Sequence, residues 1–134
     1  EEKPELDALI AAVKSILGDQ VKDVRAATKP IDGAACLVSP DGVSSSMEKL
    51  MRVMQKSDGI PQKILELNPD HALVRALMHI CKSGADDDTF KDMVNTLFDT
   101  TLLLDGYMNE PFAMAERNMR LLRQAAGWYS DLRK

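Results

Sequence analysis

The chain has 134 residues, with 17 basic and 21 acidic side chains, so its net charge is -4. This length allows one domain with its own hydrophobic core, and 45% hydrophobic with 28% charged residues is typical of a soluble globular domain. The mildly acidic balance argues against a nucleic-acid partner, and the short apolar runs argue against a membrane span. Because the sequence begins at Glu1 without an initiator methionine, we expect a fragment or a processed product.

The first part of the chain predicts a helix and two strands. Apolar residues at helical spacing predict a helix over residues 4–17, which ends at Gly18. Strands are predicted over residues 21–28 and 34–38, with a turn that contains proline and glycine between them. The second strand is apolar without alternation, so we expect it to be buried on both faces.

Another helix, a strand and a third helix are predicted next. Consecutive serines at the start of residues 44–54 offer N-caps for a helix over that segment. Residues 62–67 predict the third strand. Asn68 is then the expected N-cap of the next helix and Pro69 its first residue, and this helix continues to about Lys82.

Two long helices complete the chain. The first is predicted over residues 86–104, because an acidic run favours a helix N-terminus and Asp105 with Gly106 favours its end. The second is predicted over residues 109–132.

The order of elements predicts an α+β fold, with a small three-stranded sheet and flanking helices followed by a C-terminal helical segment. We expect a single domain over residues 1–134. The part that contains the sheet and its flanking helices would occupy residues 1–84. The helical part, which is the candidate for dimerisation, would occupy residues 85–134.

Methionine is unusually frequent, with eight against six aromatic residues. Several lie on one apolar stripe of the helix predicted over residues 44–54. The members of this stripe, here called the Met stripe, are Val43, Met47, Leu50, Met51 and Met54. The stripe either packs on the sheet as ordinary core or forms an adaptable apolar binding surface, because flexible Met side chains accept many shapes.

The last two helices are apolar over more than one face. The final helix carries a seven-residue apolar repeat, while Arg117, Arg120, Arg123, Glu116 and Gln124 occupy the remaining positions. A helix with two apolar faces needs two partners, and the second is either a further copy of this chain in a four-helix bundle or, in a monomer, the other helices. The predicted dimer interface comprises Leu97, Thr101, Leu102, Leu104, Phe112, Ala115, Met119, Leu122 and Ala126.

Few residues suggest catalysis. Cys36 and Cys81 indicate free, reduced thiols. His71 and His79 do not have common zinc-site spacing with Cys81, and His71 is expected to cap a helix or lie on the surface. We predict no catalytic residue, no metal ligand and no cofactor, and we keep as an alternative a small thiol or metal enzyme that uses Cys81 with His71 or His79.

Three segments together resemble the C-terminal dimerisation domain of the ninety-kilodalton heat-shock chaperone family, in its bacterial form. They are residues 34–39 (AACLVS), 47–52 (MEKLMR) and 63–71 (KILELNPDH), of which the last is the most specific. Residues 99–107 (DTTLLLDGY) are similar to the family's penultimate helix. The resemblance covers roughly residues 5–126.

The resemblance implies a dimerisation and client-contact module of an ATP-dependent chaperone. It places client contacts on Val43, Met47, Leu50 and Met51, and periodicity adds Met54. The family's ATP site lies in other domains, so no catalysis is expected in this segment. The implied partners are a second copy and unfolded client proteins, with no nucleic acid or membrane, in a bacterial cytoplasm or an organelle. The alternative is a dimeric helical scaffold with no client role.

Overall fold

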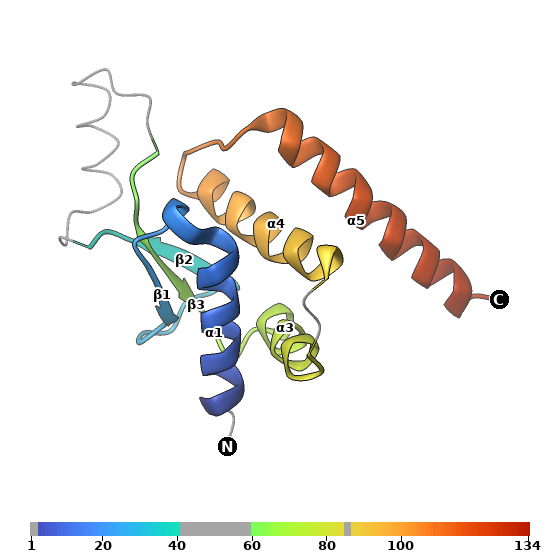
Figure 1. The fold of residues 1–134 in the computed structure, drawn as a ribbon, viewed down its shortest axis with the longest axis horizontal. Helices are drawn as coiled ribbons and strands as arrows, with labels where there is room; N and C mark the ends of the chain where they lie inside the picture. The colour runs from blue at the N-terminus through green and yellow to red at the C-terminus, as the bar shows by residue number, and fades with distance from the viewer. Residues whose placement is uncertain (1–2, 41–59, 85–86) are drawn as a thin grey trace.

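The computed structural model describes residues 3–40, 60–84 and 87–134 (Figure 1). In chain order its elements are α1 (Lys3–Leu17), the 3-10 helix η1 (Gly18–Gln20), β1 (Asp23–Ala26), β2 (Ala35–Val38), β3 (Ile64–Leu67), α3 (Ala72–Lys82), α4 (Asp88–Leu104) and α5 (Pro111–Leu132). The fold is therefore α+β, as the sequence predicts. The helix predicted over residues 44–54 lies outside the described residues.

The strands form one mixed sheet in the order β1-β3-β2. Strand β3 runs parallel to β1 and antiparallel to β2, and their register aligns Val24, Leu65 and Leu37 across the sheet. The prediction that the 34–38 strand is buried on both faces is wrong, because β2 lies at an edge and all its residues are only half-buried. The central position belongs to β3, where Leu65 and Leu67 are buried.

Helices α1, α3 and α4 build the hydrophobic core with the sheet (Figure 1). Helix α1 packs on β1, α3 and α4, and α4 also packs on β2. Each helix contributes its apolar stripe, as the periodicity predicts. Core residues from these helices include Leu9, Val13, Leu17, Val74, Leu77, Met78, Phe90, Val94 and Phe98.

Helix α3 begins later than the sequence predicts. Its N-cap is His71, whose Nδ1 accepts a hydrogen bond from the Leu73 amide at 3.1 Å. The expected cap, Asn68, instead donates through Nδ2 to the carbonyls of Ile31 and Gly33, at 3.0 Å each. Asn68 therefore holds the connection between β1 and β2 in place, and the chain turns once more before the helix starts.

The C-terminus of α4 is closed by a glycine motif, which confirms the predicted stop. Gly106 has a φ of 91°, its amide donates to Leu103, and the Tyr107 amide donates to Leu102 at 2.9 Å. These paired bonds satisfy the last carbonyls of the helix, and a left-handed residue is required at their centre. Tyr107 then enters the core, where it is buried.

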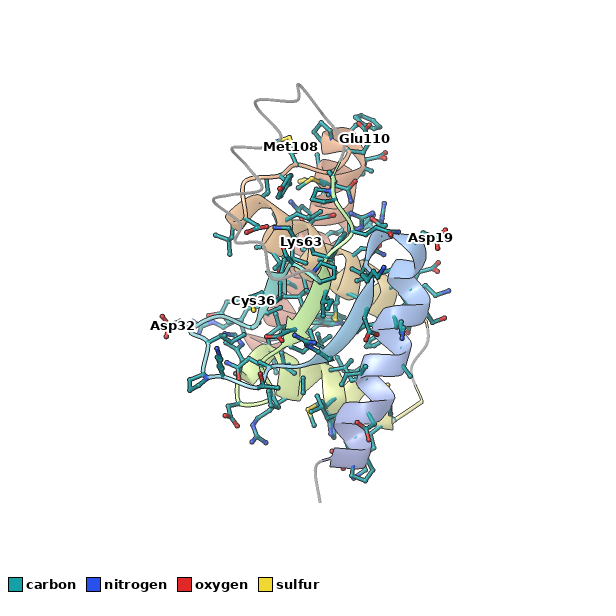
Figure 2. The ribbon with its side chains drawn as sticks, turned by 90° about the vertical axis from the view of Figure 1, so that its left-hand side faces the viewer. Asp19, Asp32, Cys36, Lys63, Met108 and Glu110 are labelled. Atoms are coloured by element: carbon teal, nitrogen blue, oxygen red, sulfur yellow. The ribbon has the colours of Figure 1, made fainter. Side chains whose placement is uncertain are left out.

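A buried ion pair fixes this end of α4 to the sheet. Lys63 Nζ lies 2.6 Å from Asp105 Oδ2, and the Lys63 side chain is only 2% exposed. Its ammonium also lies 5.2 Å from the centre of the Tyr107 ring. Because Lys63 immediately precedes β3, the sheet determines where the chain leaves α4 and turns toward α5. In Figure 2, Lys63 lies at the end of the sheet that points toward Met108 and Glu110, the residues just before α5.

We expect Gly106→Ala to lower the free energy of unfolding by about 1–2 kcal/mol, because an L-residue is strained at this positive φ. Gly127→Ala is the matched control. Gly127 lies inside α5 with no heavy atom near an added Cβ, so alanine should raise helix stability by up to about 1 kcal/mol. Urea unfolding followed by circular dichroism measures both, and a Gly106→Ala variant at least as stable as the parent would contradict the requirement.

Candidate interaction surface on the last helix

Helix α5 has no buried residue in the described chain, although it is the longest helix there. It runs antiparallel to α4 and extends beyond the beginning of α4 toward the C-terminus (Figure 1). One of its faces lies toward α4, where Met114 and Leu121 are half-buried. The rest of α5 is open to solvent within this chain.

The outward face of α5 carries the predicted apolar repeat. We call it the α5 stripe, and it comprises Phe112, Ala115, Met119, Leu122, Ala126 and Tyr129. Phe112 is 71% exposed, Met119 64% and Leu122 61%. A continuous row of large exposed apolar side chains on one helix is typical of a surface that another macromolecule covers.

The predicted interface residues on α4 are placed differently from those on α5. Leu97, Thr101 and Leu102 are buried inside this chain, and the Thr101 hydroxyl donates to the Leu97 carbonyl at 2.7 Å. Leu104 is 82% exposed at the end of α4. The exposed members of the predicted set are therefore Leu104 and those in the α5 stripe.

A row of polar contacts joins the inward face of α5 to α4. Its most buried member is Asp99, which is 4% exposed. The Asp99 carboxylate accepts hydrogen bonds from Arg117 Nη1 on α5 and, at 3.0 Å, from Asn109 Nδ2 in the connection between the helices. A buried carboxylate needs such partners, because desolvation otherwise disfavours its charge.

The second contact is bidentate. Arg120 Nε and Nη2 donate to the two oxygens of Asp92 at 2.8 and 2.9 Å, and Arg117 Nε lies 4.0 Å from the same carboxylate. The hydrogen bond from Arg120 holds the pKa of Asp92 below its usual range, although burial acts in the opposite direction. Asp92 therefore stays ionised and both of its oxygens are occupied.

A third contact lies near the beginning of α4, where Gln124 Nε2 donates to Thr89 Oγ1 at 2.7 Å. Together, the pairs Asp99–Arg117, Asp92–Arg120 and Thr89–Gln124 form what we call the α4–α5 polar ladder. In the sequence pattern these α5 residues occupy the positions that the apolar repeat leaves to polar side chains. The signal that was missed is Asp92 and Asp99, two carboxylates seven residues apart on α4.

The client-contact residues predicted from the sequence, the Met stripe of Val43, Met47, Leu50, Met51 and Met54, lie outside the described residues. Their prediction therefore stands on sequence alone. Within residues 3–40, 60–84 and 87–134, no helix is long and apolar enough to cross a bilayer.

The candidate thiol and metal residues have structural roles or no shared site. His71 Nδ1 is occupied as the α3 cap, and the described segments contain no group of three or more His, Cys, Asp or Glu residues that could hold a metal ion. Both cysteines are free and half-buried. Burial, followed by the nearby Glu66 carboxylate, raises the pKa of the Cys36 thiol, and a raised thiol pKa disfavours the nucleophilic thiolate.

The sequence of the chain is similar to those of known proteins. The sequence model of the family described as Hsp90 protein matches residues 1–133. A relative named chaperone protein HtpG, from Oleidesulfovibrio alaskensis, is 44% identical over 135 aligned positions, which cover 100% of this chain and 21% of the relative. Proteins of the same name from Nitratidesulfovibrio vulgaris and Paramagnetospirillum magneticum are 41% and 36% identical, over 93% and 90% of this chain and 20% of each relative. The chain thus spans about a fifth of the length of these relatives.

We expect Asp92→Asn to lower the free energy of unfolding by about 2 kcal/mol near neutral pH, because a charge-assisted bidentate contact is lost. The folded pKa of Asp92 is lowered, so its contribution is complete above the unfolded value of about 3.9. It disappears as the pH falls through the lower folded pKa. The difference between wild type and variant should therefore shrink in strong acid.

Urea unfolding at about pH 7 and again at about pH 3 measures this difference. Asp70→Asn is the matched control, because Asp70 is 89% exposed and lies 4.0 Å from Arg75, a geometry that contributes little. An effect of Asp92→Asn that is no larger than that of Asp70→Asn would show that the Arg120 contact is not stabilising.

Proposed function

Since this chain belongs to the Hsp90 protein family, we propose that it is the dimerisation and client-contact part of a molecular chaperone. The observation that carries the dimerisation proposal is the α5 stripe, which this chain exposes along its last helix. The stripe has the seven-residue repeat of a helix-packing seam. Two copies related by a two-fold axis would cover each other's stripe.

The proposed role of dimerisation is to hold two long chains together. The relatives are about five times as long as this chain, which spans 21% of the first of them. Joining two copies at this segment raises the effective concentration of their remaining parts for one another. We propose that this segment acts without a cofactor and without catalysis, and that it works in the cytoplasm of a bacterium.

The proposed client contact rests on the Met stripe. Its methionines would offer a deformable apolar surface, and a symmetric dimer would present two such surfaces. A client in this proposal is an unfolded or partly folded protein that exposes apolar side chains. Recognition of this kind depends on apolar area and needs no defined sequence.

We expect the purified chain to have about twice its 14.8 kDa mass when size-exclusion chromatography is coupled to light scattering at micromolar concentration. Met119→Glu combined with Leu122→Glu should yield monomers, because like carboxylates would meet across the seam and the apolar contact would be lost. Both side chains are mainly exposed within one copy, so the variant should still fold.

Ser130→Glu is the control for this experiment, since it adds a carboxylate to an exposed position of α5 that is already polar. This variant should remain dimeric. A wild-type chain that elutes as a monomer would refute dimerisation, and a Met119→Glu, Leu122→Glu variant that stays dimeric would refute dimerisation through α5.

Replacing Met47, Leu50 and Met51 together by serine should weaken binding of a permanently unfolded model protein, with dimer mass unchanged, because the apolar contact area is lost. Fluorescence anisotropy of the labelled unfolded protein measures the binding. Unchanged binding would favour a dimeric scaffold with no client role for this helix. Unfolding of the variant would show that these residues are part of the core.

A further inference from the structure

The rotation of α5 about its own axis decides what the chain presents to a partner. The α5 stripe faces outward only at the observed rotation, and a turn of the helix by one residue, about 100°, would move the stripe sideways toward α4. Contacts on the opposite face of α5 must therefore select this rotation. That face meets α4 and leaves no α5 residue buried.

Apolar contacts alone do not select a rotation here. The apolar side chains of α5 that approach α4 include Met114 and Leu121, both only half-buried. Apolar contact is non-directional, and a Met side chain adapts its shape to several packings. By contrast, Arg–carboxylate pairs with two parallel hydrogen bonds fix direction as well as distance.

We propose that the α4–α5 polar ladder is the positioning device of the dimer, which holds α5 at the one rotation that turns the α5 stripe toward a second copy. This inference rests on the proposed dimerisation. Arg117, Arg120 and Gln124 lie on the side of α5 that faces α4. They act on the partner only through the orientation of the stripe.

The ladder also fixes the route of the chain into α5. Asn109, which bonds to Asp99, donates as well to Gln20 Oε1 at 3.2 Å. The connection before α5 is thus tied both to α4 and to η1. Asp92 is the central member, since it is held by Arg120 and also lies close to Arg117.

A double-mutant cycle on Asp92 and Arg120 tests this positioning role. Dimer dissociation constants would be measured by analytical ultracentrifugation for Asp92→Asn, Arg120→Gln and the double variant. We expect each single substitution to weaken the dimer about tenfold. We expect the double variant to be no weaker than the single ones, because the pair acts as a unit.

Arg123→Gln is the matched control, because it removes the same charge from an exposed position of the same helix, outside the ladder. It should change dimer affinity by less than about twofold. Circular dichroism should show equal helix content in all variants, which separates a change of orientation from loss of the helix.

Two outcomes would overturn the inference in different ways. A stable dimer whose affinity is insensitive to the ladder, or in which the two single effects add, would refute the positioning role and leave dimerisation standing. A wild-type chain that is monomeric at every concentration would refute both. Equal weakening by Arg123→Gln would show that only net charge matters.

Discussion

Helix α5 buries no side chain in the part of the chain that the structure describes, and the organisation of the C-terminal part depends on this constraint. Most helices in proteins gain their stability from the packing of an apolar face and not from helix propensity. Among the described elements, α5 packs mainly on α4. The position of α4 therefore decides the position of α5.

Helix α4 has two different neighbours on its two sides. One side enters the core through Phe90, Val94 and Phe98, and the other carries Asp92 and Asp99 toward α5. Its end is tied to the sheet by the Lys63–Asp105 pair. The sheet thus orients α4 by burial and by charge, and α4 orients α5 mainly by charge. The apolar residues of the α5 stripe stay exposed.

This division has a physical logic. Apolar surface that packs inside the chain is no longer available to bind a partner. A helix that presents an apolar face to a partner is therefore better held by polar contacts on its other face. Such contacts are weak when exposed, but Asp99 is buried and the Asp92 side chain is only 14% exposed. Their pairing is therefore both directional and costly to break.

Periodicity and stop signals alone determined most of the fold. The helices containing Leu9, Phe98 and Leu122 and the three strands lie where apolar spacing predicts them, and Gly106 ends α4 as expected, because these signals act over a few neighbouring residues. The exposed stripe of α5 was also visible in the sequence. Only the tertiary structure decided that β3 is central, that Asn68 bonds to the connection between β1 and β2 instead of capping α3, and that Asp92 and Asp99 pair with Arg120 and Arg117. Each of these depends on which distant segments meet, and a local pattern carries no record of a partner that lies 28 or 37 residues away along the chain.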